Sequence, residues 1–154
     1  MDRSVKHHLM IVKPRYIEPI ITGRKTIECR LSRTLKPPFG CVERGDTLWL
    51  KASGGPIVAT IRARRVSYVH PVTPDALDAI LDQYGPSILA APLFFENNRS
   101  ARYGTIIHLS HVRHVQPIRI AKQDRRAWLR LLEPPRDVGV TVRLERTGQS
   151  LARS

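Results

Sequence analysis

Short segments in which apolar and polar residues alternate are the feature of this sequence that most constrains its fold. In residues 26–31 three apolar side chains alternate strictly with three polar ones: Ile27, Cys29 and Leu31 against Thr26, Glu28 and Arg30. A strand places successive side chains on opposite faces, so this segment predicts one apolar and one polar side. Similar alternation, or a short apolar run, predicts strands at residues 8–12, 47–51, 57–69, 103–115 and 138–144.

Helical signals lie between these strands. Apolar residues recur at helical spacing in residues 15–22, and Gly23 fits the cap that ends such a helix. Thr73 and Pro74 open a second helix, which we expect to end at residues 85–86. Residues 87–95 predict a short helix broken at Pro92, and residues 124–132 predict a short amphipathic helix that carries Trp128.

Five to six strands with two to three short helices indicate an α+β fold, a small mixed and partly closed β-barrel. The sequence has no regular strand–helix–strand alternation and no glycine-rich phosphate loop, which disfavours Rossmann and P-loop nucleotide folds. We expect a single domain over residues 1–145. Residues 146–154 are small and polar and are expected to be a disordered tail.

The charge balance is unusual: 26 Lys and Arg against 13 Asp and Glu give a formal net charge of +13. Such an excess favours polyanions, of which RNA and DNA are the usual ones. An arginine-rich, lysine-poor composition also follows from a GC-rich genome, so charge alone leaves that alternative open.

The remaining totals exclude several classes of protein. No apolar run approaches the roughly 20 residues that cross a bilayer. Two cysteines are too few for a disulfide scaffold, and His108, His111 and His114 lie on opposite sides of one predicted strand, so we expect no metal site. We therefore expect a cytoplasmic protein with no cofactor, no membrane partner and no obligate protein partner. The oligomeric state stays open.

The polar side of residues 26–30 is the strongest candidate site. Lys25 stands at the helix-to-strand junction, and Thr26, Glu28 and Arg30 follow on one face about 7 Å apart. A lysine made neutral by its surroundings can remove a proton, Glu28 can hold it or act as the base, and Arg30 can bind a phosphate or an oxyanion. A solvated Lys–Glu–Arg face on an edge strand is the alternative.

The sequence from Leu9 to Val69 resembles the ASCH domain family of the PUA-like superfamily. The family pattern G-x-K-x-x-x-x-R is matched by Gly23, Lys25 and Arg30, and its Gly-Asp before the next strand by residues 45–46. Residues 102–115 resemble its long late strand, so the likeness covers about residues 8–118.

This resemblance implies a PUA-like barrel with a cleft suited to RNA or nucleotide-derived ligands. Some small bacterial members are amidohydrolases of N4-acetylcytidine, which use the motif lysine, a threonine three residues later as nucleophile and a glutamate from the helical insertion. Lys25 matches the lysine, but the nucleophile position is Glu28. The hydroxyl of Thr26, or a water held by Glu28, would serve instead, and Glu96 would be the insertion acid.

Further candidates surround this motif. Arg24, Arg99, Arg102 and Tyr103 could join Arg30 in binding a ligand, with the tyrosine ring stacking on a base. Among residues with a plainer role, His7 and His8 suggest a surface pair, Trp49 and Trp128 suggest packing residues, and Cys29 suggests a buried thiol.

The sequence therefore favours a basic cleft for cytidine-type nucleosides or RNA and a hydrolase that removes acyl groups from N4-acylcytidine. In this hypothesis Lys25, Thr26, Glu28 and Glu96 are catalytic. A non-catalytic RNA-binding module and a single-stranded RNA nuclease are the alternatives.

Overall fold

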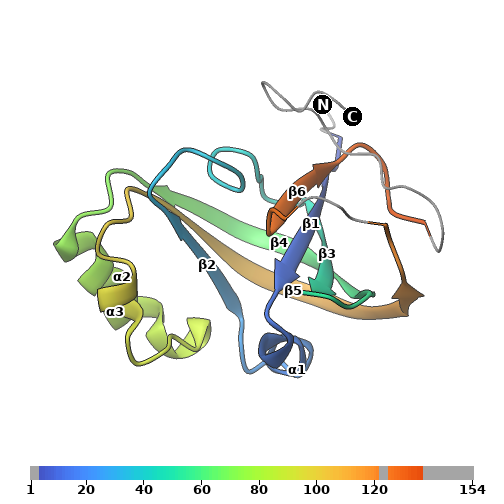
Figure 1. Ribbon diagram of the computed structural model, residues 1–154, viewed down its shortest axis with the longest axis horizontal. Helices are drawn as coiled ribbons and strands as arrows, with labels where there is room; N and C mark the ends of the chain where they lie inside the picture. Colours follow the sequence, from blue (N-terminus) through green and yellow to red (C-terminus); the bar gives the residue numbers. More distant parts are fainter. Residues whose placement is uncertain (1–3, 122–124, 137–154) are drawn as a thin grey trace.

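The computed structural model of the protein describes residues 4–121 and 125–136. A single curled sheet of six strands forms most of the structure (Figure 1). Its strands are β1 (His7–Val12), β2 (Ile27–Ser32), β3 (Thr47–Ala52), β4 (Ile57–Val69), β5 (Tyr103–Ile118) and β6 (Trp128–Leu131). The helices are η1 (Pro14–Tyr16), α1 (Ile17–Ile21), α2 (Pro74–Ile88) and α3 (Phe94–Asn97). The predicted α+β class, a small mixed sheet with short helices, is confirmed.

The strand order β2-β5-β4-β3-β1-β6 makes β2 and β6 the two edges of the sheet. Only β1 and β3 pair in parallel, and every other neighbouring pair is antiparallel. The long strands β4 and β5 curl the sheet, and their register shifts between Ala63 and Arg65, where a bend was predicted. The sheet folds back on itself without pairing its edges.

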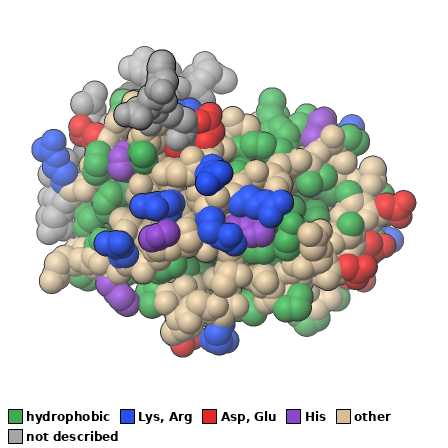
Figure 2. Space-filling model, turned by 180° about the vertical axis from the view of Figure 1, so that it is seen from behind, with side chains coloured by type: hydrophobic (Ala, Val, Ile, Leu, Met, Phe, Trp, Pro, Cys, Tyr) green, Lys and Arg blue, Asp and Glu red, His purple; other side chains and the backbone are tan. Residues whose placement is uncertain are grey.

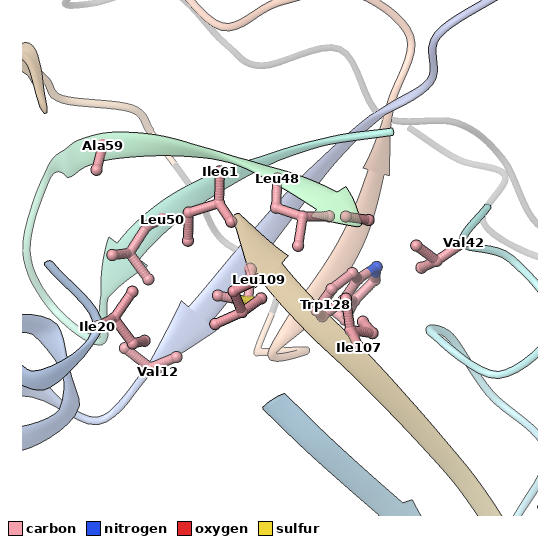
Figure 3. Packing of buried hydrophobic residues seen from close by; sticks show 12 residues of the cluster. Val12, Ile20, Val42, Leu48, Leu50, Ala59, Ile61, Ile107, Leu109 and Trp128 are labelled. Carbon is pink, nitrogen blue, oxygen red and sulfur yellow. The ribbon is translucent and has the colours of Figure 1, made fainter. Parts of the chain in front are cut away.

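The main core fills the inside of this curl. It joins Met10 of β1, Leu48 and Leu50 of β3, Ile107 of β5 and Trp128 of β6, all almost fully buried (Figure 3). A second cluster lies on the outer side of β2 and β5, where Ile80 and Ile88 of α2 pack on Ile27 and Ile106. The sheet is therefore covered on both sides at its β2 end.

Two predicted helix boundaries, the end of α1 and the start of α2, are confirmed. Gly23 adopts φ +85° directly after α1 and donates its backbone N–H to the Ile20 carbonyl, as a C-terminal cap does. The Thr73 hydroxyl accepts the Ala76 N–H at 3.0 Å and starts α2.

Three predicted boundaries were wrong. Helix α2 continues through Pro86 to Ile88 and ends at Leu89, which takes the left-handed conformation. The next helix is only residues 94–97. Residues 128–131, predicted as part of a helix, form strand β6, because pairing with β1 satisfies their backbone and buries Trp128. The predicted strand at 138–144 and the tail at 146–154 lie outside the described residues.

Candidate functional site

The polar side of β2 faces the inside of the curled sheet. Glu28 is opposite Ile107 of the neighbouring strand β5, a member of the main core, and Arg30 is opposite Thr105 of the same strand. The apolar side, with Ile27, packs against α2. The side predicted to be polar therefore looks into the barrel, which is why its charges are buried.

Lys25 is buried, with 5% of its surface exposed. Its Nζ donates hydrogen bonds to the carbonyl oxygens of Ile27 at 3.0 Å and Ile88 at 2.7 Å, and it lies 3.3 Å from Glu28 Oε1. The Ile88 carbonyl belongs to the last turn of α2, where a cation satisfies a carbonyl that has no partner within the helix. An ammonium group has three N–H bonds, and three acceptors surround this one. Lys25 thus ties the start of β2 to the end of α2.

Glu28 lies between two cations and is 7% exposed. Its Oε1 faces Lys25, and its Oε2 accepts a hydrogen bond from Arg30 Nε. Burial raises the pKa of this carboxyl, but the charges and hydrogen bonds of Arg30 and Lys25 outweigh burial, and the net pKa is below its ordinary value. Glu28 is therefore a buried, ionised carboxylate.

Arg30 bridges the two edges of the sheet. From edge strand β2, its Nη2 donates to the Ile11 carbonyl of β1 at 2.8 Å and its Nη1 to the Ala127 carbonyl before β6 at 3.3 Å. Its guanidinium also lies 5.3 Å from the ring centre of Trp128. Two of its five N–H bonds thus close the seam between β2 and β1–β6, a third donates to Glu28 on the same strand, and two have no partner among the described residues.

A pocket of about 250 Å³ opens in this seam beside Arg30. Three aromatic side chains line it, from a loop, β5 and β6: Phe39, Tyr103 and Trp128. Three cationic side chains line it too: Arg30, Lys36 and Arg126. No Asp or Glu of the described ranges is among its lining residues. We call it the Arg30 pocket.

Thr105 lies in the wall of the Arg30 pocket. Its hydroxyl is buried and has no hydrogen-bond partner among the described residues. Such a group costs about 1–3 kcal/mol when left unsatisfied, so a ligand or a water that reached it would recover that cost. Tyr103, two residues earlier on the same face, stacks on His70 with ring centres 4.2 Å apart and planes at 4°.

The structure brings Lys25, Glu28 and Arg30 together and leaves the other predicted catalytic residues apart from them. Thr26 and Glu96 are both exposed. Within the described residues, no side-chain hydrogen bond or ion pair joins either of them to Lys25 or Glu28. Their catalytic roles stay predictions.

The predicted ligand contacts are also scattered. Tyr103 lines the Arg30 pocket, whereas Arg24 is exposed and pairs with Glu18 at 2.7 Å. Arg99 borders a separate hollow of about 120 Å³ beside Pro74, and Arg102 is exposed. Lys36, Phe39 and Arg126 were missed, since nothing in a loop sequence indicates which strand edge it will meet.

A second buried polar network was missed. His8, predicted as part of a surface pair, is fully buried because β1 lies between β3 and β6. Its Nε2 is 3.0 Å from Asp46 Oδ2, and its Nδ1 accepts the Trp128 Nε1–H at 3.2 Å. An indole N–H is only a donor, so Nδ1 carries no proton and Nε2–H donates to Asp46. The signal in the sequence is Asp46 of the Gly-Asp pair, whose pattern indicates a turn before the next strand and matches the family, but does not reveal a buried partner.

Burial lowers the pKa of His8 below its ordinary 6.5, against the opposing hydrogen bond and charge of Asp46. His8 is therefore neutral, as its two hydrogen bonds require.

Cys29 faces α2, away from the pocket, as predicted for a buried thiol. Burial, followed by the nearby charge of Glu28, raises its pKa to about 12. A thiolate nucleophile at this position is thereby disfavoured.

The described ranges contain neither a cluster of metal-binding side chains nor a helix that could span a membrane. No group of three or more His, Cys, Asp and Glu side chains is placed to hold a metal ion. Over the same ranges, no helix has the length and apolar character that a membrane span needs.

Solved structures with the same arrangement of elements identify the fold. The crystal structure of an ASCH protein from Zymomonas mobilis matches with a TM-score of 0.58 at 14% sequence identity, over 73% of each chain. The chain has the ASCH domain fold. Two mutants of the Zymomonas protein, one with Tyr replaced by Phe and one with Ser replaced by Ala, match with TM-scores of 0.56 at 15% and 16% identity. No family model and no curated protein matches this sequence.

The ASCH-type fold thus agrees with the resemblance that residues 23–30 and 45–46 carried. At such low identity, the likeness extends to the fold and not to an activity.

Proposed function

We propose that the protein binds a cytidine-type nucleoside unit, free or within RNA, in the Arg30 pocket. The observation that carries this proposal is the composition of the pocket, with aromatic rings and cations from both edges of the sheet and no acidic side chain among the described lining residues. A volume of about 250 Å³ is small for a ligand pocket and suits one nucleoside unit. The choice of cytidine comes from the resemblance of Lys25 and Arg30 to the amidohydrolase motif.

The chemistry of the lining fits such a ligand. A base can stack on the partly exposed rings of Phe39 or Tyr103, which is worth about 1–3 kcal/mol per base. Lys36 is exposed at the pocket and can contact a phosphate, while Arg30 can turn its two remaining N–H bonds to a carbonyl oxygen of the base. Thr105 offers a hydroxyl from the wall.

Hydrolysis of an N4-acylated cytosine is the reaction we propose at this site. It is favoured by the ionised carboxylate of Glu28, which Arg30 links to the pocket. A water beside Glu28 gives a proton to the carboxylate while its oxygen bonds to the acyl carbon. The oxyanion faces Arg30, the C–N4 bond breaks, and the amine nitrogen takes the proton as cytidine and the carboxylic acid leave.

In this form of the reaction Glu28 is the base and Lys25 is a positioning residue. Water is preferred to Thr26 as the nucleophile because, in the described part of the chain, the Thr26 side chain has no hydrogen bond to Lys25 or Glu28, whereas Glu28 reaches Arg30 directly.

The proposal is tested by incubating the purified protein with N4-acetylcytidine between about pH 6 and 9 and measuring cytidine release. We expect turnover that depends little on salt and is lost in Glu28→Gln. The exposed pocket variant Lys36→Gln should keep nucleoside turnover. If Glu28→Gln fails to fold, Tyr103→Leu serves as the test in its place and should raise KM.

Other outcomes separate the alternatives. If N4-acetylcytidine is untouched but cytidine binds, the reaction is excluded and the binding proposal stands. If cytidine and cytidine monophosphate both fail to bind, the binding proposal is wrong. Cleavage of single-stranded RNA without nucleoside turnover would favour the nuclease alternative.

A further inference from the structure

The outer side of β4 and β5 carries a second concentration of charge, away from the Arg30 pocket. Helix α2 covers only one end of this side, where Ile80 packs on Ile106. Its cover ends where the Tyr84 ring meets His108 edge-on, with ring centres 5.5 Å apart. Beyond that point this side of the sheet is bare in the described part of the chain, and Arg62 and Arg113 are exposed there.

The strand register sets which side chains occupy the bare sheet. Ala59, Ile61 and Ala63 of β4 are buried in the main core, so Arg62 between them points outward. Arg62 pairs with Ser110, and Arg65 pairs with His108. The register shift between Ala63 and Arg65 gives β4 an extra residue, Arg64, which is also exposed.

Arg113 on β5 extends the same surface beside Thr60. Figure 2 shows Lys and Arg side chains gathered around His on the middle of the face turned away from the viewer of Figure 1, with acidic side chains at its margins. We define the outer arginine face as Arg62, Arg64, Arg65 and Arg113, all of which are exposed.

These four guanidinium groups have no acidic partner in the described part of the chain. The ion pairs that described residues form elsewhere, such as those of Arg24 and Arg30, do not include the outer arginine face. Neighbouring groups feel this charge: after burial, Arg64 and then Arg65 lower the pKa of His108. A polyanion would relieve the repulsion among them.

We propose that the outer arginine face binds the phosphodiester backbone of a nucleic acid, as a contact surface separate from the Arg30 pocket. Outward residues on one strand recur about every 7 Å, so the face offers a row of cations and not a single anion site. Guanidinium groups suit phosphate oxygens, and backbone contacts carry no sequence information. This inference is independent of the ligand of the Arg30 pocket.

The test is the salt dependence of binding to a labelled single-stranded RNA, measured by fluorescence anisotropy. We compare Arg62→Gln/Arg64→Gln with Lys13→Gln/Arg24→Gln, which removes the same charge from exposed positions near α1. The first variant should weaken binding more than tenfold at low salt and reduce the slope of log K against log salt by about 1 for each arginine replaced. The matched control should change affinity by less than threefold.

Single-stranded DNA of the same length should bind like RNA if the backbone is what this face holds. The inference is overturned if the two double variants lose affinity equally, or if neither does. It is also overturned if polyglutamate of equal charge competes as well as RNA, since the face would then serve an acidic protein.

Turnover of N4-acetylcytidine by Arg62→Gln/Arg64→Gln keeps this test distinct from that of the pocket. We expect that rate to match the wild type whenever the pocket is active.

Discussion

Two buried polar networks meet at Trp128, and they differ in charge and in what lies at their ends. In one, Asp46 and the indole N–H of Trp128 hold a neutral His8 from both sides. In the other, Lys25, Glu28 and Arg30 form a charged chain, and Arg30 lies over the Trp128 ring. The first network ends inside the core, whereas the second ends at the Arg30 pocket.

The difference shows where the fold tolerates buried charge. Both ring nitrogens of His8 are satisfied, so that network fixes β1 between β3 and β6 and has no capacity for a ligand. Buried ions are costly and are often replaceable by apolar groups without loss of stability. The charged chain is therefore best explained by the seam that it closes and the pocket it serves.

Removing the charge of Glu28 should have the largest effect. Glu28→Gln leaves the buried Lys25 and the half-buried Arg30 without this counter-charge, and we expect a loss of about 3–5 kcal/mol in the free energy of unfolding, measured with urea. The control Glu18→Gln removes a carboxylate from an exposed pair with Arg24 and should cost less than about 1 kcal/mol. Equal losses in the two variants would show that the chain does not hold the sheet closed.

The neutral network should have a smaller effect and a different pH window. His8→Ala leaves the Trp128 N–H and the Asp46 carboxylate without this partner and should cost about 1–3 kcal/mol. His8→Gln can donate to one and accept from the other and should cost less.

The pH dependence of stability separates the two networks further. Because the folded pKa of His8 lies below 6.5, its contribution is complete above pH 6.5 and is lost as pH falls from 6.5 through the folded pKa. That part of the urea-denaturation profile should vanish in His8→Gln. Glu28 has a folded pKa below 4.5, so its contribution is complete above pH 4.5 and is lost as pH falls from 4.5 through the folded pKa. A His8→Gln profile identical to that of the wild type would mean that His8 does not titrate in this way.

The sequence alone predicts much of the fold and part of the candidate site, and physical reasons explain why it does not predict the rest. Alternation located β2 and β4, and the spacing of Gly23, Lys25 and Arg30 indicated the fold. The pattern could not say that both sides of β2 are buried, because that depends on α2 covering one side and the curl enclosing the other.

The local sequence pattern also could not predict the part of the site that β6 and the loop around Phe39 supply. The neighbours of Trp128 fit an amphipathic period, which predicts a helix. In the structure Trp128 instead lies on a strand, β6, because this segment pairs with β1. The pocket needs Phe39, Tyr103 and Trp128 from three distant segments, and only the closure of the sheet brings these together.

The most direct test of ligand binding in the Arg30 pocket is a titration of the ¹⁵N-labelled protein with cytidine monophosphate, followed through its two indole N–H signals. Trp128 lines the Arg30 pocket, whereas Trp49 lies on β3, where its indole N–H donates to His7. We predict that the Trp128 signal shifts in a saturable way and that the Trp49 signal stays in place. A titration in which the Trp128 signal does not move, or in which both signals move together, would contradict specific binding of this ligand in the Arg30 pocket.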